Sequence, residues 1–295
     1  MRERLIEILG KTSDPEAVVW LQQTVDEQGK SFQQRPFYYA FSGVSRRFDK
    51  KATTDAGVGQ LTFLSKTAPG FTVAGWDEFR LARVILLTVL AEQEKDIFLE
   101  NLKALIGTAD LREQVAIFSA FPLLPHPAAL VEFATDGLRS NIIDIFDSIS
   151  LNNPFASENF TDEAWNQMVL KAIFITRPLY RIVGHGERTN LALAEAISDL
   201  AHERWAAGRT ITPEAWRSCT NFLEERISGD IAKMAGSSEA NDRSAAALVV
   251  STAEGKLDSL KDRLSKEIAA IESGELTWHS LGQTVEEQLI RKSLT

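Results

Sequence analysis

The chain has 295 residues, of which 44% are hydrophobic and 25% are charged, and its formal net charge is −9. This composition is ordinary for a folded protein and excludes extended disorder. The acidic balance, without a stripe of Lys and Arg interleaved with aromatic residues, argues against nucleic acid as a partner. The single cysteine, Cys219, can form no internal disulfide, and no secretory leader is evident, so we expect a cytoplasmic protein.

The longest apolar run, LARVILLTVLA from Leu81 to Ala91, is flanked by charged residues. It is about half as long as the roughly 20 residues that a helix needs to span a bilayer. The run therefore predicts a buried core helix and no transmembrane segment.

Apolar residues recur at spacings of three and four along the chain, whereas alternating runs rich in β-branched residues are scarce. The sequence therefore predicts an all-α fold. Ser13, Thr161 and Thr212 each precede acidic residues, a pattern typical of helix starts. We expect helices near residues 2–9, 15–28, 33–47, 57–66, 77–93, 95–106, 111–120, 127–138, 141–150, 162–175, 190–206, 213–234, 238–252, 255–272 and 283–291.

The middle of the chain reads as successive antiparallel helix pairs, at a spacing near the roughly 40 to 47 residues of HEAT-type repeats. We predict a short α-solenoid of HEAT-like antiparallel helix pairs that forms a single globular unit. In this prediction residues 1–50 form an N-terminal helical cap, residues 51–235 the repeat core, and residues 236–295 the C-terminal packing helices.

No catalytic or metal motif stands out. Gly10 and Gly29 each begin a Gly-Lys-Ser/Thr triplet but lack the upstream glycine of a phosphate-binding loop, and both favour helix ends. The sequence GHGERT from Gly184 lacks the third glycine of a dinucleotide fingerprint. The histidines are scattered, and Cys219 is best explained as a buried structural thiol. We therefore predict no catalytic residues, no metal and no cofactor.

The predicted helix at residues 162–175 is apolar on most sides yet carries Asn166 and Lys171. A buried amide without partners costs about 1 to 3 kcal/mol, so we expect Asn166 to be hydrogen-bonded. Lys171 either extends to the surface or pairs with a carboxylate, for which Asp144 and Asp147 on the preceding helix are candidates.

Further polar groups surround this helix, and arginine among them suits recognition of carboxylate or phosphate. Two interpretations stay open: these groups satisfy loop backbones and one another, or they form a pocket for a small anionic or polyhydroxylated ligand or a docking surface for a protein. The candidate ligand- or partner-binding residues are Asp144, Asn152, Asn166, Lys171, Arg177, Tyr180, Arg181, His202 and Arg204.

Two long strings, ASENFTDEAWNQMVLKAIFITRPLYRIVG and ISDLAHERWAAGRTITPEAWR, carry a family resemblance. Together with the preceding HPAALVEFATDGLRSNIIDIFDSISLNNPF they resemble the EboA-domain family, closely over Arg112 to Arg217. The turn at Gly184, His185 and Gly186 departs from the longer side chains expected there.

The resemblance implies a place in a bacterial gene cluster for secondary metabolism and for export of an intermediate across the cytoplasmic membrane. Its implied partners are TIM-barrel proteins, a cyclase-like protein and a membrane prenyltransferase-like protein, and a peripheral position at the inner face of the membrane is compatible with them. It implies no catalytic residues.

Three hypotheses follow. The first is a non-catalytic helical-repeat protein that binds partner enzymes or a small polar or anionic intermediate. The second is an enzyme of cyclitol or prenyl-type secondary metabolism, with Asp144, Lys171, Arg177, Tyr180 and His202 converging in one pocket. The third is a purely structural adaptor held at the membrane. We favour the first.

Overall fold

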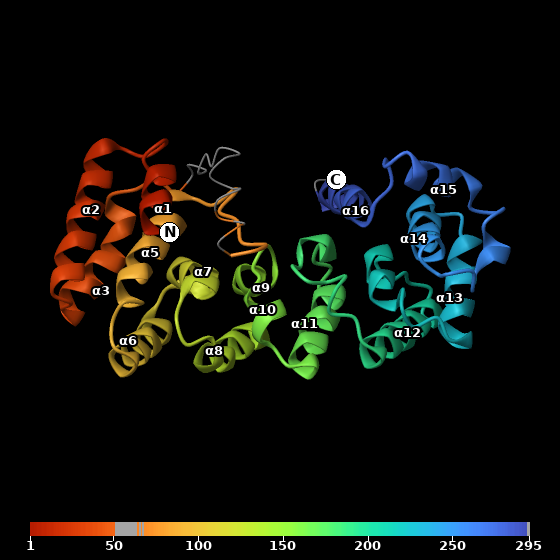
Figure 1. Ribbon diagram of the computed structural model, residues 1–295, viewed down its shortest axis with the longest axis horizontal. Coiled ribbons are helices and arrows are strands. Elements are labelled where there is room, and N and C mark those ends of the chain that lie inside the picture. Colours follow the sequence, from red (N-terminus) through yellow and green to blue (C-terminus); the bar gives the residue numbers. More distant parts are fainter. Residues whose placement is uncertain (51–63, 65, 67, 294–295) are drawn as a thin grey trace. The chain divides into compact units, whose positions relative to one another are not determined.

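The regular elements of the protein are helices, as a computed structural model shows for residues 1–50, 64, 66 and 68–293 (Figure 1). The predicted all-α fold is confirmed over this described part. The expected helix at residues 57–66 falls almost entirely outside the described residues. The HEAT-like repeat stays a prediction, as does the division at residues 50 and 235.

The chain divides into two compact units, Met1–Asn159 and Phe160–Thr295, where the sequence suggested a single one. The boundary falls in the short connection between two helices, and the contacts within each unit define its own core. We call them unit 1 and unit 2. No helix in the described part of either unit combines the length and the apolar character needed to cross a membrane.

Unit 1 is organised around α5, which packs against α1, α2 and α7, while α7 packs against α9 (Figure 1). The α5 helix is the apolar run expected to be buried, and all but two of its residues are buried. Its elements are α1 (Arg2–Leu9), α2 (Pro15–Lys30), α3 (Gln34–Gly43), η1 (Val44–Arg46), α5 (Glu78–Leu90), α6 (Lys95–Thr108), α7 (Leu111–Ala120), η2 (Phe121–Leu123), α8 (Pro127–Arg139), α9 (Ile143–Ser150) and α10 (Phe155–Asn159).

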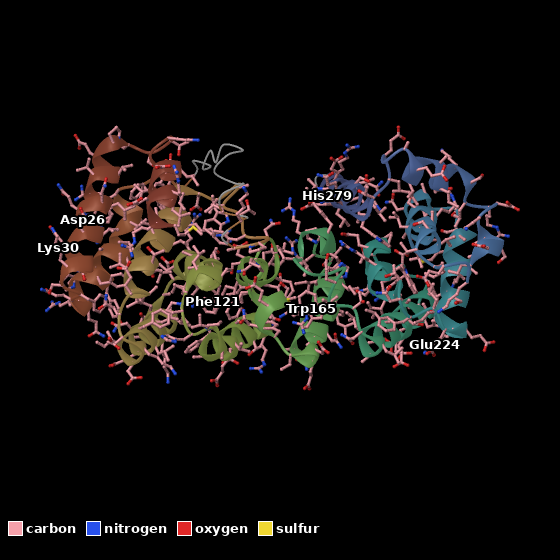
Figure 2. The ribbon with its side chains drawn as sticks, viewed as in Figure 1. Asp26, Lys30, Phe121, Trp165, Glu224 and His279 are labelled. Atoms are coloured by element: carbon pink, nitrogen blue, oxygen red, sulfur yellow. The ribbon has the colours of Figure 1, made fainter. Side chains whose placement is uncertain are left out.

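Unit 2 is organised around α14, whose residues 245–250 are all buried and which contacts α13, α15, α16 and η4. A second buried element is α11, where Trp165 is fully buried (Figure 2). The elements of unit 2 are α11 (Asp162–Phe174), η3 (Leu179–Arg181), α12 (Leu191–Ala206), η4 (Pro213–Cys219), α13 (Glu225–Ala235), α14 (Ala240–Ser251), η5 (Asp258–Leu260), α15 (Ser265–Glu272) and α16 (Trp278–Ser293).

The expected helix at residues 213–234 is not continuous. The chain forms the 3-10 helix η4, leaves helical structure near Asn221, and resumes as α13. Residues 218–221, Ser-Cys-Thr-Asn, have low helix propensity, which explains the break. The helix expected at 283–291 begins earlier, because the Thr277 hydroxyl accepts the N–H of Ser280 at 3.0 Å and the Ser280 hydroxyl accepts the N–H of Thr277 at 2.9 Å.

The guanidinium of Arg83, in the middle of α5, is buried in the core of unit 1 with 1% of its surface exposed. Its Cζ lies 5.7 and 5.5 Å from the ring centroids of Phe41 and Phe79. Its Nε donates to the Phe41 carbonyl at 3.2 Å, and its Nη2 lies 3.7 Å from Oε1 of Glu113 in α7. Burial lowers the pKa of Arg83, and the Glu113 carboxylate opposes that shift. The carboxylate therefore stabilises a cation that the core otherwise disfavours.

Replacing this carboxylate by Glu113→Gln should lower the free energy of unfolding by about 3 kcal/mol, because the variant removes the carboxylate that stabilises the buried Arg83 charge most strongly. The amide can still accept the Asp110 N–H that Glu113 Oε2 accepts at 3.0 Å, so the capping hydrogen bond survives. Urea denaturation measures the loss. Glu100→Gln, at an exposed position of α6, should change the value by less than about 0.5 kcal/mol. Equal losses in the two variants would contradict the assignment.

Candidate functional site

The helix α11 begins where the sequence predicted, because the Thr161 hydroxyl accepts the Ala164 N–H at 3.3 Å. Its burial is less complete than expected: Phe174 is 71% exposed. The expected hydrogen bonding of Asn166 is found. Asn166 and Asn190 exchange side-chain hydrogen bonds of 3.0 and 2.8 Å, and Asn190 also caps α12. The Asn166 amide therefore ties α11 to the start of α12.

Lys171 lies half-buried on α11, and desolvation lowers the pKa of its ammonium group. Its proposed partner Asp144 lies in α9 of unit 1, so their pairing stays a prediction. Asn152 follows α9 in a left-handed conformation with a φ of 53°, which asparagine tolerates better than most residues. Its side chain is exposed, whereas the neighbouring Asn153 is buried and donates to the carbonyls of Ser148 and Phe118.

The structure brings Tyr180 and Arg181 together on η3. The Tyr180 hydroxyl donates to Oε2 of Glu286 in α16 at 2.6 Å, and Arg181 Nη2 lies 3.2 Å from the same oxygen. Arg181 Nε also donates to the Tyr180 hydroxyl at 3.1 Å. We define the η3 cluster as Tyr180, Arg181, Glu214 and Glu286. Tyr180 and Arg181, two of the candidate binding residues, thus bind a carboxylate of the protein itself.

Glu214, in η4, holds the backbone of the turn that carries Tyr180. It is 3% exposed, and its Oε1 accepts the Tyr180 N–H at 2.6 Å, while the Leu179 N–H also donates to the carboxyl group. The pKa of Glu214 is raised to about 7, mainly by burial and to a smaller extent by the nearby Glu286, against the effect of the two N–H donors. The carboxyl group of Glu214 therefore fixes the turn that carries Tyr180.

His202 and Arg204, both on α12, make separate contacts. His202 Nε2 lies 2.7 Å from Oδ1 of the buried Asp230, to whose other oxygen Ser198 donates at 2.6 Å. Arg204 donates to the Thr210 carbonyl at 3.3 Å. The last candidate, Arg177, is half-buried directly after α11. Convergence of all nine candidate residues in one pocket stays a prediction.

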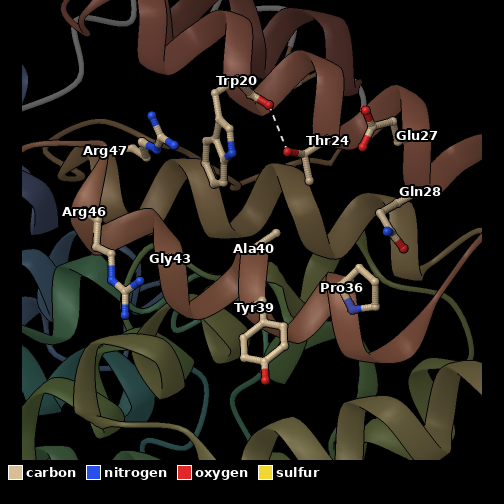
Figure 3. A pocket seen from close by; sticks show the side chains of 10 residues that line it. All are labelled: Trp20, Thr24, Glu27, Gln28, Pro36, Tyr39, Ala40, Gly43, Arg46 and Arg47. Carbon is tan, nitrogen blue, oxygen red and sulfur yellow. Dashed lines mark hydrogen bonds between the residues drawn. The ribbon is translucent and has the colours of Figure 1, made fainter.

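A pocket of about 390 Å³ lies in unit 1 between α2, α3 and η1 (Figure 3), a region that the sequence-based interpretation did not single out. This volume falls in the range of small-molecule sites. Two arginines lie on one side of the pocket, with a glutamate and a buried glutamine on the other. Its lining residues are Trp20, Thr24, Glu27, Gln28, Pro36, Tyr39, Ala40, Gly43, Arg46 and Arg47.

Two contacts order the lining of this pocket. The Arg47 guanidinium lies over the Trp20 indole, with 5.5 Å from Cζ to the ring centroid, and this cation–π contact orients both side chains. Gln28 accepts the Gln33 N–H at 2.9 Å through Oε1, which turns its amide nitrogen away from that bond. The pocket therefore offers an aromatic face, two cations and a hydrogen-bond donor. Two arginines that are adjacent in the sequence do not by themselves predict a binding site. The pocket is recognisable only in the folded structure, where residues of α2 and η1 line the same cavity.

The buried nucleophiles of unit 2 are closed to substrate. Ser218 Oγ lies 3.0 Å from His185 Nε2, yet both residues are almost fully buried. The pKa of His185 is lowered to about 3, mainly by burial and to a smaller extent by the nearby Arg217. Burial also raises the pKa of the Cys219 thiol far above neutrality. Among the described residues, no group of three or more His, Cys, Asp and Glu side chains is placed to hold a metal ion.

The fold and these sites define an all-α protein with an arginine-bearing pocket and internally paired polar clusters. The chain belongs to the family described as metabolite traffic protein EboA, which matches residues 1–220. That range contains the α2/α3 pocket and three of the four residues of the η3 cluster. No curated protein and no solved structure matches the chain.

The raised pKa of Glu214 predicts a pH-dependent stability. Between about pH 4.5 and about pH 7 the folded protein binds this proton more tightly than the unfolded chain does, so its contribution to the free energy of unfolding falls as the pH rises through that window. Glu214→Gln keeps an acceptor for the Tyr180 N–H and removes the titration. We expect the urea midpoint to fall less between pH 5 and pH 8 in the variant than in the wild type.

The matched control is Glu224→Gln, at an exposed position after η4 (Figure 2). This control should retain the pH dependence of the wild type. The same slope in Glu214→Gln as in the wild type would show that Glu214 does not titrate in this window.

Proposed function

We propose that this protein is a non-catalytic component of metabolite traffic that binds a small polar or anionic intermediate and hands it between proteins of its cluster. The description of the family supports the traffic role, and the α2/α3 pocket is the observation on which the binding role depends. The proposed partners are the TIM-barrel, cyclase-like and membrane prenyltransferase-like proteins of the cluster. We propose a cytoplasmic location with access to the inner face of the membrane.

The chemistry of the pocket fits a planar anion. An arginine can pair with a planar carboxylate through two parallel hydrogen bonds, and the Trp20 indole beneath the Arg47 guanidinium holds that cation at the pocket. Glu27, on the opposite side in Figure 3, can accept a hydrogen bond from a hydroxyl or amino group of the ligand. In a chain with a net charge of −9, two adjacent guanidinium groups also provide a local attraction for anions.

Two features of unit 2 support binding rather than conversion. The buried Ser218–His185 pair has no route to a substrate on its own, since the side chains are 0% and 2% exposed. The His185 Nδ1 atom has no hydrogen-bond partner among the residues that the structure describes, whereas a nucleophile-activating histidine is oriented by a third group. The nine sequence candidates, led by Tyr180 and Arg181, remain proposed contacts for a ligand or a partner.

A second candidate function is supported by His202. Its side chain is 49% exposed and is held by the buried carboxylate of Asp230, an arrangement that orients an imidazole for proton transfer. Lys233 lies 3.7 Å from the ring centroid of the neighbouring Trp205. These groups favour the alternative of an enzyme of cyclitol or prenyl-type secondary metabolism, in which His202 acts as general acid or base.

Native mass spectrometry of the protein purified from its own host tests the proposed function. The wild type should carry a mass excess that disappears on denaturation, and Arg47→Gln should lose most of this excess because the variant removes the cation beside Trp20. Arg139→Gln is the control, since Arg139 lies on α8 of the same unit, pairs with Asp136 and does not line the pocket. An equal excess in wild type and Arg47→Gln would place the ligand elsewhere, and no excess in any sample would contradict metabolite binding.

A further inference from the structure

The contact between α16 and η3 resembles a ligand complex formed within one chain. The Glu286 carboxylate accepts one hydrogen bond from the Tyr180 hydroxyl at 2.6 Å and lies 3.2 Å from Nη2 of Arg181. Phenol and guanidinium donors that converge on one carboxylate oxygen are the groups used to recognise acidic ligands. The contact therefore shows that these two side chains can bind a carboxylate.

The α16 helix packs closely against η3 beside this carboxylate. A Cβ atom added at Gly282 would lie 2.5 Å from Cδ1 of Tyr180, so only glycine allows the helix to approach this ring. The imidazole of His279, one turn earlier, meets the Tyr180 ring edge to face at 5.0 Å between centroids. Tyr180 thus couples the carboxylate contact to the position of the whole helix.

Glu286 and the side chains that bind it lie in different parts of the chain. Tyr180, Arg181 and Glu214 lie within residues 1–220, the part of the chain that matches the family, whereas Glu286 lies beyond it. Glu286 also stands near the carboxyl group of Glu214, and their like charges repel when both are ionised. The Arg181 and Glu286 side chains are 41% and 20% exposed, so solvent and solutes can reach the contact. A competing carboxylate can therefore approach without unfolding of unit 2.

We propose that Tyr180 and Arg181 form a carboxylate-binding site, that Glu286 occupies it intramolecularly, and that the carboxylate of a small metabolite displaces Glu286 and releases this end of α16. This inference rests on the proposed function for the premise that the protein binds anionic metabolites, but its site is separate from the α2/α3 pocket. The release of α16 would couple ligand binding to exposure of the helix surface that now covers η3 and η4.

Isothermal titration of the full chain with benzoate tests this site. Glu286→Gln weakens the internal competitor and should bind benzoate about tenfold more tightly than the wild type, which corresponds to about 1.4 kcal/mol. Glu287→Gln is the matched control on α16, because Glu287 is exposed and pairs with Arg291 rather than with η3. This control should bind benzoate with the affinity of the wild type.

Two further variants show where the benzoate binds. Adding Tyr180→Phe or Arg181→Gln to Glu286→Gln should abolish the gain, and Tyr180→Phe keeps the ring against which Gly282 packs. Adding Arg47→Gln should leave the gain intact, because Arg47 lies in unit 1. Circular dichroism melting confirms that each variant is folded. Hydrogen exchange in residues 278–293 of the wild type should rise on addition of benzoate.

Equal benzoate affinities for Glu286→Gln and Glu287→Gln would overturn the intramolecular competition. A gain that survives both Tyr180→Phe and Arg181→Gln would overturn the site. Loss of the gain through Arg47→Gln alone would assign the benzoate to the α2/α3 pocket, which would leave the proposed function standing while this inference fails. The converse result is a gain in affinity that depends on Arg181, with no mass excess in protein purified from the host. That result would support this inference and contradict the proposed function.

Discussion

A single buried carboxyl group, that of Glu214, organises the η3 cluster of unit 2. It accepts backbone N–H groups from the turn η3 and thereby fixes the side chains of Tyr180 and Arg181 on the side where α16 packs. Without this acceptor the N–H groups of a buried turn would lack partners, which proteins rarely tolerate. The same group places a titratable charge next to Glu286. The order of the turn and the electrostatics of the η3 cluster therefore both depend on Glu214.

Some buried polar groups in both units are held by specific partners, although other buried atoms, such as Nη1 of Arg83, have no hydrogen-bond partner among the described residues. Arg83 has the Phe41 carbonyl and the Glu113 carboxylate, and Asn166 and Asn190 satisfy one another. Such pairs fix the relative placement of helices, because apolar packing alone tolerates sliding. They also leave few polar groups in the described core for chemistry. The ligand sites that we propose are partly exposed contacts, where a guanidinium group lies beside an aromatic ring.

The sequence predicted the helices well where local chemistry decides them. The cap at Thr161 and the apolar run of α5 are examples. It predicted the hydrogen bonding of Asn166 from burial alone, but not the partner Asn190, which lies 24 residues away. The Tyr180–Glu286 contact spans 106 residues, and no local pattern encodes it. The break after η4 was visible only as weak propensity, which a 22-residue helical pattern concealed. Most of the helices could therefore be predicted from the sequence, whereas the long-range contacts between side chains could not.

We propose that the protein binds an acidic metabolite and returns it unchanged. Equilibrium dialysis of the full chain against a small-molecule extract of its host, followed by mass spectrometry of both compartments, tests this claim most directly. The account predicts that a carboxylate-bearing compound is enriched on the protein side and is recovered at its original mass after prolonged incubation. Conversion of an enriched compound to a product of different mass would contradict the account and favour the enzyme with His202 at its centre.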